Sequence, residues 1–210
     1  MPLSKADLEQ RMRKTTLTEE RLVVEPYFDN ATDDEKAAPA SLDFHLGSRF
    51  VFLRRGRGPY HDPIDESQRS EASGTEVFIP LGANMYLHPG QLVLGTTLEW
   101  YRFPSDLMAY VVGRSIWGRR GLLVVTASAV QPNTSGTITL ELSNIGEVAV
   151  RIRPGVALGQ LFFHQVDPHQ RTQKHPPFSV THRPIFGTYK LSHVERVLVG
   201  MPENASATDV

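Results

Sequence analysis

Short apolar runs separated by turn-forming residues constrain the fold of this chain more than any other feature. In the clearest run, Thr137–Ser143, three apolar residues alternate with polar ones: Ile138, Leu140 and Leu142. A period of two places the apolar set on one face of a β-strand and the polar set on the other. The chain also has 16 Gly and 15 Pro in 210 residues, and both residues favour turns. The pattern therefore favours a mainly β fold, which could be a sandwich, a jelly roll or a barrel.

The same pattern predicts further strands along the chain. They are Phe50–Leu53, Glu76–Leu81, Met85–Leu87, Gln91–Trp100, Leu107–Val112, Leu122–Val125, Val148–Ile152 and Leu158–Val166. Ser4 and Asp7 have the spacing of a capping box, which predicts a short helix ending near Met12. Residues 54–73 are polar and aperiodic, which indicates a surface insertion, and residues 203–210 have the composition of a frayed tail.

Composition and charge exclude several classes of protein. The formal net charge is -1, with 22 Lys+Arg and 23 Asp+Glu, whereas general nucleic-acid binders are usually strongly basic. The chain has no cysteine, which excludes disulfides, thiol nucleophiles and Cys-ligated zinc. No apolar run approaches the ~20 residues that span a bilayer. Met1–Arg13 is too charged for a signal peptide. We therefore expect a cytoplasmic protein that binds neither nucleic acid nor a membrane.

A basic segment, Gly113–Gly121, is the first candidate binding site. It contains three glycines, one serine and three arginines, and it contains no acid. Glycine allows close approach of the backbone, and arginine pairs bidentately with phosphate oxygens, so the segment suits a polyphosphate. A solvated basic turn is the alternative. Trp117 lies inside the segment and could either pack or contact a ligand.

Glu141 is the candidate for proton transfer. A lone carboxylate on the polar face of a strand usually faces solvent, but a neighbouring subunit covering that face would raise the carboxyl pKa and suit it to proton transfer. The histidines give weaker evidence of a functional site than Glu141 does. His193–Glu195 matches half of the zinc deaminase signature, but the cysteine half is missing, so we attribute the match to chance. No histidine pair has a standard metal-ligand spacing, and we predict no metal held by the protein.

Several motifs follow one another in an order that resembles a known family. They are Pro39–Gly47, Tyr86–Gly90, Gly113–Ser115, Gly136–Leu142, Pro154–Gly155 and Gly159–Leu161. From about Leu3 to about Val166 the chain resembles the dCTP deaminases of the trimeric dUTPase-like superfamily. The resemblance implies a distorted β jelly roll of the β-clip, dUTPase-like type and a homotrimer with active sites at subunit interfaces. It also implies conversion of dCTP to dUTP and ammonia without zinc, with Mg²⁺ accompanying the triphosphate.

The resemblance also implies roles for particular residues. Glu141 matches the proton-shuttling glutamate of the family, and Ser115 and Arg119 match residues that position the water and the phosphates. Further positions match the nucleotide-binding segments of the family: Arg114, Ile116, Trp117, Gly118, Gln131, Thr139, Leu140 and Gln160. Among these, Thr139 and Leu140 match backbone contacts to the base, and Gln160 matches a contact to the phosphate or sugar.

The chain departs from the family pattern at four places. The segment Val124–Ala127 is one residue shorter than usual. Ile116 stands where the family usually has a second serine. Gln131 replaces an aspartate that holds the sugar 3′-hydroxyl and that in dUTPases activates water, a task that an amide cannot perform. The usual lid is not recognisable, although Arg183 and Phe186 resemble a dUTPase lid in which Arg meets phosphate and Phe stacks on the base. We therefore divide the chain into a β domain, residues 1–182, and a possible lid and tail, residues 183–210.

Three functions remain open on these residues. The first is a zinc-independent dCTP deaminase, or a relative acting on a related cytosine nucleotide, because Ser115, Arg119 and Glu141 are retained. The second is a non-catalytic or regulatory nucleotide-binding trimer, because Ile116, Gln131 and the lid depart from the pattern. The third, a dUTPase or a bifunctional deaminase and pyrophosphatase, is disfavoured by Gln131.

Overall fold

Short β-strands are the main regular elements of the described chain. The computed structural model describes residues 2–13, 21–28, 39–53, 62, 64, 74–126, 129–167, 182–184 and 191–199. The helices are α1 (Lys5–Met12), α2 (Ser115–Gly118) and α3 (His193–Leu198). The strands are β1 (Val23–Glu25), β2 (Leu42–His45), β3 (Arg49–Leu53), β4 (Gly74–Phe78), β5 (Met85–Leu87), β6 (Leu92–Thr96), β7 (Trp100–Arg102), β8 (Leu107–Gly113), β9 (Leu122–Val124), β10 (Ala129–Val130), β11 (Ser135–Gly136), β12 (Thr139–Asn144), β13 (Val150–Ile152) and β14 (Ala157–Gln165). The mainly β class expected from the sequence is confirmed.

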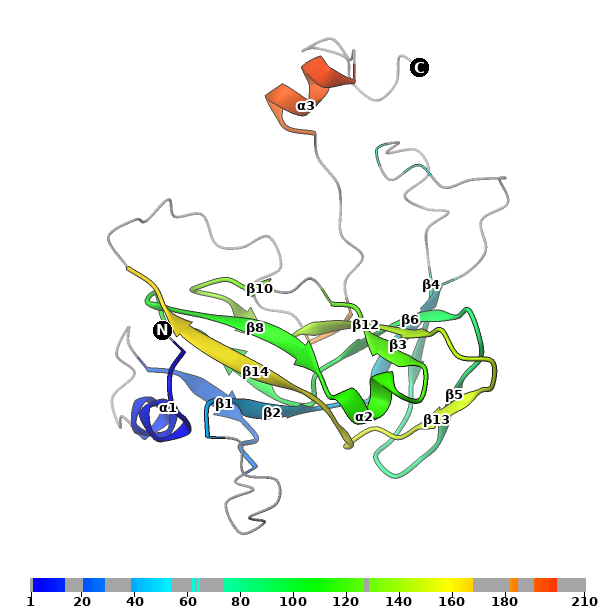
Figure 1. Ribbon diagram of the computed structural model, residues 1–210, viewed down its shortest axis with the longest axis horizontal. Helices are drawn as coiled ribbons and strands as arrows, with labels where there is room; N and C mark the ends of the chain where they lie inside the picture. Colours follow the sequence, from blue (N-terminus) through cyan, green and yellow to red (C-terminus); the bar gives the residue numbers. More distant parts are fainter. Residues whose placement is uncertain are drawn as a thin grey trace.

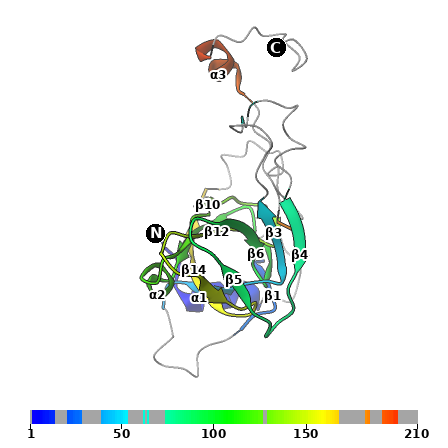
Figure 2. The same cartoon turned by 90° about the vertical axis from the view of Figure 1, so that its right-hand side faces the viewer.

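The strands form four antiparallel sheets around one interior. Two sheets are large, with strand orders β10-β8-β14-β2 and β4-β3-β6-β12-β9, and two are small, with orders β1-β7-β11 and β13-β5. Figure 1 shows β8 and β14 running side by side towards α2, with β12 and β6 beyond them. Figure 2 shows the strands curling around a common interior, with β3 and β4 on the side opposite α2.

The interior is filled by aromatic and aliphatic side chains from all of these layers. Phe103 stacks on Phe163 with ring centroids 5.4 Å apart, and α1 contributes Leu8, which is fully buried. In β12, Leu140 and Leu142 are fully buried, while Thr139, Glu141 and Ser143, which alternate with them, are only half-buried. The period-two pattern therefore predicted correctly which face of β12 meets the core.

The capping box predicted for the first helix is confirmed. The Ser4 hydroxyl accepts a hydrogen bond from the Asp7 backbone N–H at 3.2 Å, and the Asp7 carboxylate accepts one from the Ser4 N–H at 3.1 Å. Each side chain satisfies a backbone donor that the first turn of a helix leaves unpaired. The helix ends at Met12, as expected.

The run Gln91–Trp100 is two strands rather than the single strand expected. β6 ends at Thr96 and β7 begins at Trp100. Between them the Thr97 hydroxyl donates to the carbonyl of Glu99 at 2.8 Å and accepts from the backbone N–H of Ile138 at 3.0 Å. These bonds turn the chain out of the five-stranded sheet and into the three-stranded one, which an apolar run cannot reveal.

Other boundaries differ by smaller amounts. β4 ends at Phe78, before Pro80, which has no N–H to continue a ladder. Strands β1 and β2 were not expected, and the basic segment contains the short helix α2. The insertion predicted at residues 54–73 lies outside the described residues except for 62 and 64, and the tail at 203–210 lies outside them altogether. None of the described helices has the length and apolarity needed to cross a membrane.

Candidate active site

The basic segment forms a short helical turn at the end of β8. Arg114 is the N-cap of α2 in an extended conformation, and its backbone N–H donates to Leu158 of β14 at 2.9 Å. Trp117 Nε1 donates to the Ala157 carbonyl at 2.9 Å, which ties the helix to the same strand. Ser115 is exposed at the first helical position. The segment is therefore a fixed turn with an exposed hydroxyl, as a binding loop requires.

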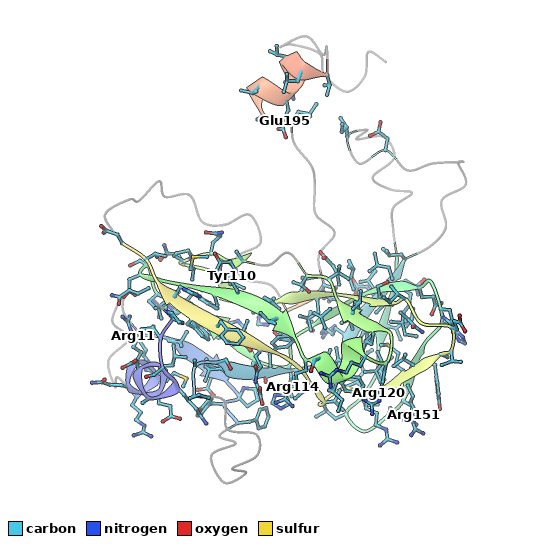
Figure 3. The ribbon with its side chains drawn as sticks, viewed as in Figure 1. Arg11, Tyr110, Arg114, Arg120, Arg151 and Glu195 are labelled. Atoms are coloured by element: carbon cyan, nitrogen blue, oxygen red, sulfur yellow. The ribbon has the colours of Figure 1, made fainter. Side chains whose placement is uncertain are left out.

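The C-terminal end of α2 presents two exposed arginines. The backbone N–H of Arg119 donates to the Ser115 carbonyl at 2.9 Å, and Arg120 Nη1 donates to the Ile116 carbonyl at 3.0 Å. The side chains of Arg119 and Ile116 are exposed and Gly118 is half-buried. Figure 3 shows Arg114 and Arg120 on either side of the helix. This charge distribution suits an anionic ligand.

Gly121 connects the helix to β9 through a close approach of two backbones. Its φ is +85°, and a Cβ there would lie 2.8 Å from the backbone of Gly146. β9 then pairs with β12 through Leu142↔Val124. The basic segment therefore leads directly into the edge strand β9, which is the neighbour of the strand that carries Glu141.

Glu141 occupies β12 at the point where its pairing with β9 changes. Its carbonyl accepts from Val125 N–H at 2.8 Å, but its own N–H donates to the hydroxyl of Thr126 at 3.1 Å. On the other side, Glu141 is the register partner of Leu94 in β6. Both backbone groups of Glu141 are therefore hydrogen-bonded on the β9 side, while β6 flanks the strand on the other.

The environment of the Glu141 carboxyl favours its protonated form. Burial raises the pKa of this carboxyl above its ordinary value, because desolvation disfavours a charge. Among the residues that the structure describes, no Lys, Arg or His makes an ion pair with Glu141 that would offset this. A carboxyl with a raised pKa is better suited to take up and release a proton than one at its ordinary value.

Two further predicted residues lie on the other large sheet and share one partner. Arg114 Nη2 donates to Asp43 Oδ2 at 2.6 Å, and Gln160 Nε2 donates to Asp43 Oδ1 at 3.1 Å. Asp43 and Gln160 are register partners on β2 and β14. The fold therefore brings together two residues that the sequence separates by 46 positions, through an acid to which we had assigned no role.

The remaining predicted residues of the β domain lie in two places. Thr139 is half-buried on the same face of β12 as Glu141, and Leu140 is buried on the other face, so that only its backbone can reach a ligand. Gln131 is exposed in the turn after β10, where its carbonyl accepts from the Thr134 hydroxyl at 2.7 Å.

The predicted lid is only partly described. Arg183 is exposed and lies 3.6 Å from Glu76 of β4, an ion pair that solvent screens strongly. β4 and β9 are opposite edges of the five-stranded sheet, so Arg183 does not join the α2 segment within one chain. Phe186 lies outside the described residues.

The residues that the structure describes contain no group of three His, Asp or Glu side chains able to hold a metal ion. In the His193–Glu195 segment, the Glu195 carboxylate accepts from the Ser192 N–H at 2.7 Å, and the Ser192 hydroxyl accepts from the Glu195 N–H at 3.3 Å. Glu195 therefore belongs to the capping box of α3.

Sequence reasoning missed Asp43 and Thr126. Asp43 lies inside the motif Pro39–Gly47, which supported the resemblance but carried no assigned chemistry. Thr126 follows an apolar run and had no signal of its own. Each acts through a hydrogen bond to a residue far along the chain, and such pairs become visible only in the folded structure.

Comparison with known proteins shows the family of this chain. The family model for dCTP deaminase-like proteins matches residues 3–166. A dCTP deaminase of Halorubrum lacusprofundi is 41% identical over 167 residues, covering 79% of this chain and 78% of the relative. A dUMP-forming dCTP deaminase of Methanobrevibacter smithii is 37% identical over 173 residues, covering 81% and 87%.

A solved structure has the same fold. The 2′-deoxycytidine 5′-triphosphate deaminase of Agrobacterium tumefaciens superposes with a TM-score of 0.55 at 21% identity. This likeness covers 77% of the present chain and 46% of that one. The molecule thus has the mainly β fold of that enzyme. The chain belongs to the dCTP deaminase-like family, which the ordered motifs had indicated.

Proposed function

We propose that this protein hydrolyses dCTP, or a closely related cytosine nucleotide, to the uracil nucleotide and ammonia. The observation that carries the proposal is the half-buried Glu141, whose carboxyl pKa is raised by burial and which lies one strand away from the basic α2 segment. The family membership and the dCTP deaminase names of the relatives support the same substrate.

The chemistry follows from one carboxylate acting twice. Glu141 takes a proton from water as the water oxygen attacks C4 of cytosine, and it then gives a proton to the departing amine. Water is consumed, and the bond from C4 to the exocyclic amine breaks as ammonia leaves. The oxygen of the water remains on C4 as C4=O. Ser115 positions the attacking water, and Arg119 balances the charge of the triphosphate and fixes its position.

The product proposed is dUTP rather than dUMP. Release of dUMP would need a base that activates water at the phosphates, and Gln131 has an amide where that base is expected. Some relatives carry the name of dUMP-forming enzymes, so pyrophosphate has to be measured together with ammonia.

In this proposal, Mg²⁺ is bound by the triphosphate of the substrate rather than by the protein. The described residues offer no cluster of carboxylates for a metal ion, whereas a triphosphate supplies oxygen ligands itself. The role left to the protein is to bind the complex through Arg119 and its neighbours.

The proposed assembly is a homotrimer with sites between subunits. Tyr110 and Val112 of β8 are 40% and 46% exposed, and Phe162 lies opposite Tyr110 on β14. We call these three residues the open apolar face. Apolar surface of this kind commonly marks a subunit contact. A lid role for Arg183 would operate across such a contact, because Arg183 lies beside β4 in its own chain.

A nucleotide-binding trimer without catalysis is the second candidate. It is favoured by Ile116, an exposed apolar residue at a position where a phosphate would be expected to find a hydroxyl. This candidate predicts saturable binding of dCTP with release of neither ammonia nor pyrophosphate.

The test is the variant Glu141→Gln with Glu147→Gln as its matched control. Glu147 is an exposed glutamate in the turn after β12. We expect Glu141→Gln to bind dCTP as the wild type does but to release ammonia at least about 100-fold more slowly, because general acid–base catalysis is lost. Glu147→Gln should retain full activity. Wild-type rates in Glu141→Gln would contradict the mechanism, and pyrophosphate released from dUTP would contradict the proposed product.

A further inference from the structure

A buried acid joins three segments that converge at the start of the α2 loop. Asp43 of β2 accepts hydrogen bonds from Arg114, which follows β8, and from Gln160 of β14. These three strands are neighbours in the sheet β10-β8-β14-β2. The two donors are residues that the family resemblance assigns to nucleotide binding.

The geometry fixes the orientation of both donors. Asp43, Gln160 and Val112 form one cross-strand row, since Gln160 is the register partner of both Asp43 and Val112, and register partners present their side chains on the same face. Arg114 lies two residues after Val112 and reaches across β14 to Asp43. Its backbone is fixed separately by the bond to the Leu158 carbonyl.

Burial makes the contact strong. The Asp43 side chain is 8% exposed and that of Arg114 is 25% exposed, so their charge-assisted hydrogen bond is only partly screened. A guanidinium has five N–H donors, and the contact with Asp43 still leaves donors for a ligand. Asp43 is therefore placed to hold Arg114 while Arg114 remains able to bind.

We infer that Asp43 is a positioning residue for nucleotide binding, holding the Arg114 guanidinium and the Gln160 amide in the orientation in which they meet the nucleotide. Asp43 itself does not touch the ligand in this arrangement. The inference rests on the proposed function, because it takes the ligand to be dCTP or its uracil product.

The chain offers a matched control for this contact. Arg11 Nη1 donates to Asp106 Oδ2 at 2.7 Å, with side chains 18% and 12% exposed. Asp106 immediately precedes β8, whereas Arg114 immediately follows it, so the two Arg–Asp pairs lie at opposite ends of one strand. A general loss of stability should affect both pairs alike, and a loss of positioning should affect only the pair at Asp43.

The experiment measures Kd for dCTP and for dUTP by calorimetry in the full-length protein, together with ammonia release and thermal unfolding. We expect Asp43→Asn to raise Kd about 10- to 100-fold, because small displacements of positioning groups have effects of this size. Asp106→Asn should lower the melting temperature similarly and leave Kd unchanged. Should Asp43→Asn fail to fold, Asp43→Glu retains the charge, displaces the donors and should still raise Kd.

A double-mutant cycle separates positioning from a direct or purely structural role. If Asp43 acts through Arg114 and Gln160, then Asp43→Asn adds little to Kd in a background that carries both Arg114→Gln and Gln160→Ala. Additive effects, or a wild-type Kd in Asp43→Asn, would overturn the inference. Wild-type protein that binds dCTP and releases no ammonia would overturn the proposed deaminase activity but not the inference. Wild-type protein that binds neither nucleotide would overturn both.

Discussion

At the scale of single residues, the position of Glu141 has consequences for stability as well as for chemistry. Its carboxyl pKa is raised by burial in the folded chain, while in the unfolded chain it returns to the ordinary value of a glutamate. Between these two values the folded state binds more protons, so the free energy of unfolding falls as the pH rises. The contribution of Glu141 to stability is complete below its unfolded pKa and is lost above its folded pKa.

Glu141→Gln is therefore expected to stabilise the protein at pH 7 relative to wild type, and to have little effect near pH 4. The substitution removes the cost of holding a charge in a half-buried site. The check is a series of melting temperatures from pH 4 to pH 7. The melting temperature of Glu147→Gln should follow that of wild type throughout this range. If the difference in melting temperature between Glu141→Gln and wild type did not depend on pH, the raised carboxyl pKa of Glu141 would not be its cause.

At the scale of secondary-structure elements, the sequence pattern correctly predicted the features that depend only on residues close together in the chain. The α1 capping box, the buried face of β12 and the limits of β5 were all predicted from neighbouring residues. The division between β6 and β7 was not, because it depends on the bond from Ile138 N–H to Thr97. The partnership of Asp43 with Arg114 was also not predicted, because 71 positions separate them along the chain.

The irregularity in β14 could not be predicted either, because it depends on residues far apart in the sequence. Its register shifts between Ala157 and Gly159, and a Cβ on Gly159 would collide with the Phe44 ring and the Val112 carbonyl. The motif Gly159–Leu161 supported the family resemblance, but only the structure explains why its first residue lacks a side chain.

We expect Gly159→Ala to destabilise the protein by about 1–3 kcal/mol, because overpacking forces the neighbouring strands apart. Thermal or denaturant unfolding measures this loss. Gly118→Ala is the control, since a Cβ there meets only Leu123 at 3.9 Å and alanine favours a helix. Equal stability of Gly159→Ala and wild type would show that the sheet can relax around the added methyl group.

At the scale of the whole molecule, the arrangement of the site points to association between subunits. The basic α2 segment leads into the edge strand β9, which pairs with the strand of Glu141, whereas Arg183 lies beside the opposite edge of the same sheet. The open apolar face on β8 and β14 shares Val112 with the cross-strand row that contains Asp43 and Gln160. A contact on this face would cover residues that a single chain leaves to solvent.

Val112→Lys is accordingly expected to weaken the proposed trimer, because it places a charge within the open apolar face. Sedimentation equilibrium should show a mass near three chains for wild type and a lower average mass for the variant. Val148→Lys is the control, since Val148 is 74% exposed in the turn between β12 and β13. A Val112→Lys protein that stays fully trimeric would place the contact elsewhere.

The two Arg–Asp pairs also give β8 an unusual mechanical role. One pair links its beginning to α1 through Arg11, and the other links its end to β2 through Arg114. A strand tied down at both ends cannot fray from either one, so its amide hydrogens should exchange with solvent only when a large part of the molecule opens. The α2 segment that follows β8 therefore begins at a fixed point of the fold, even if the rest of that segment moves.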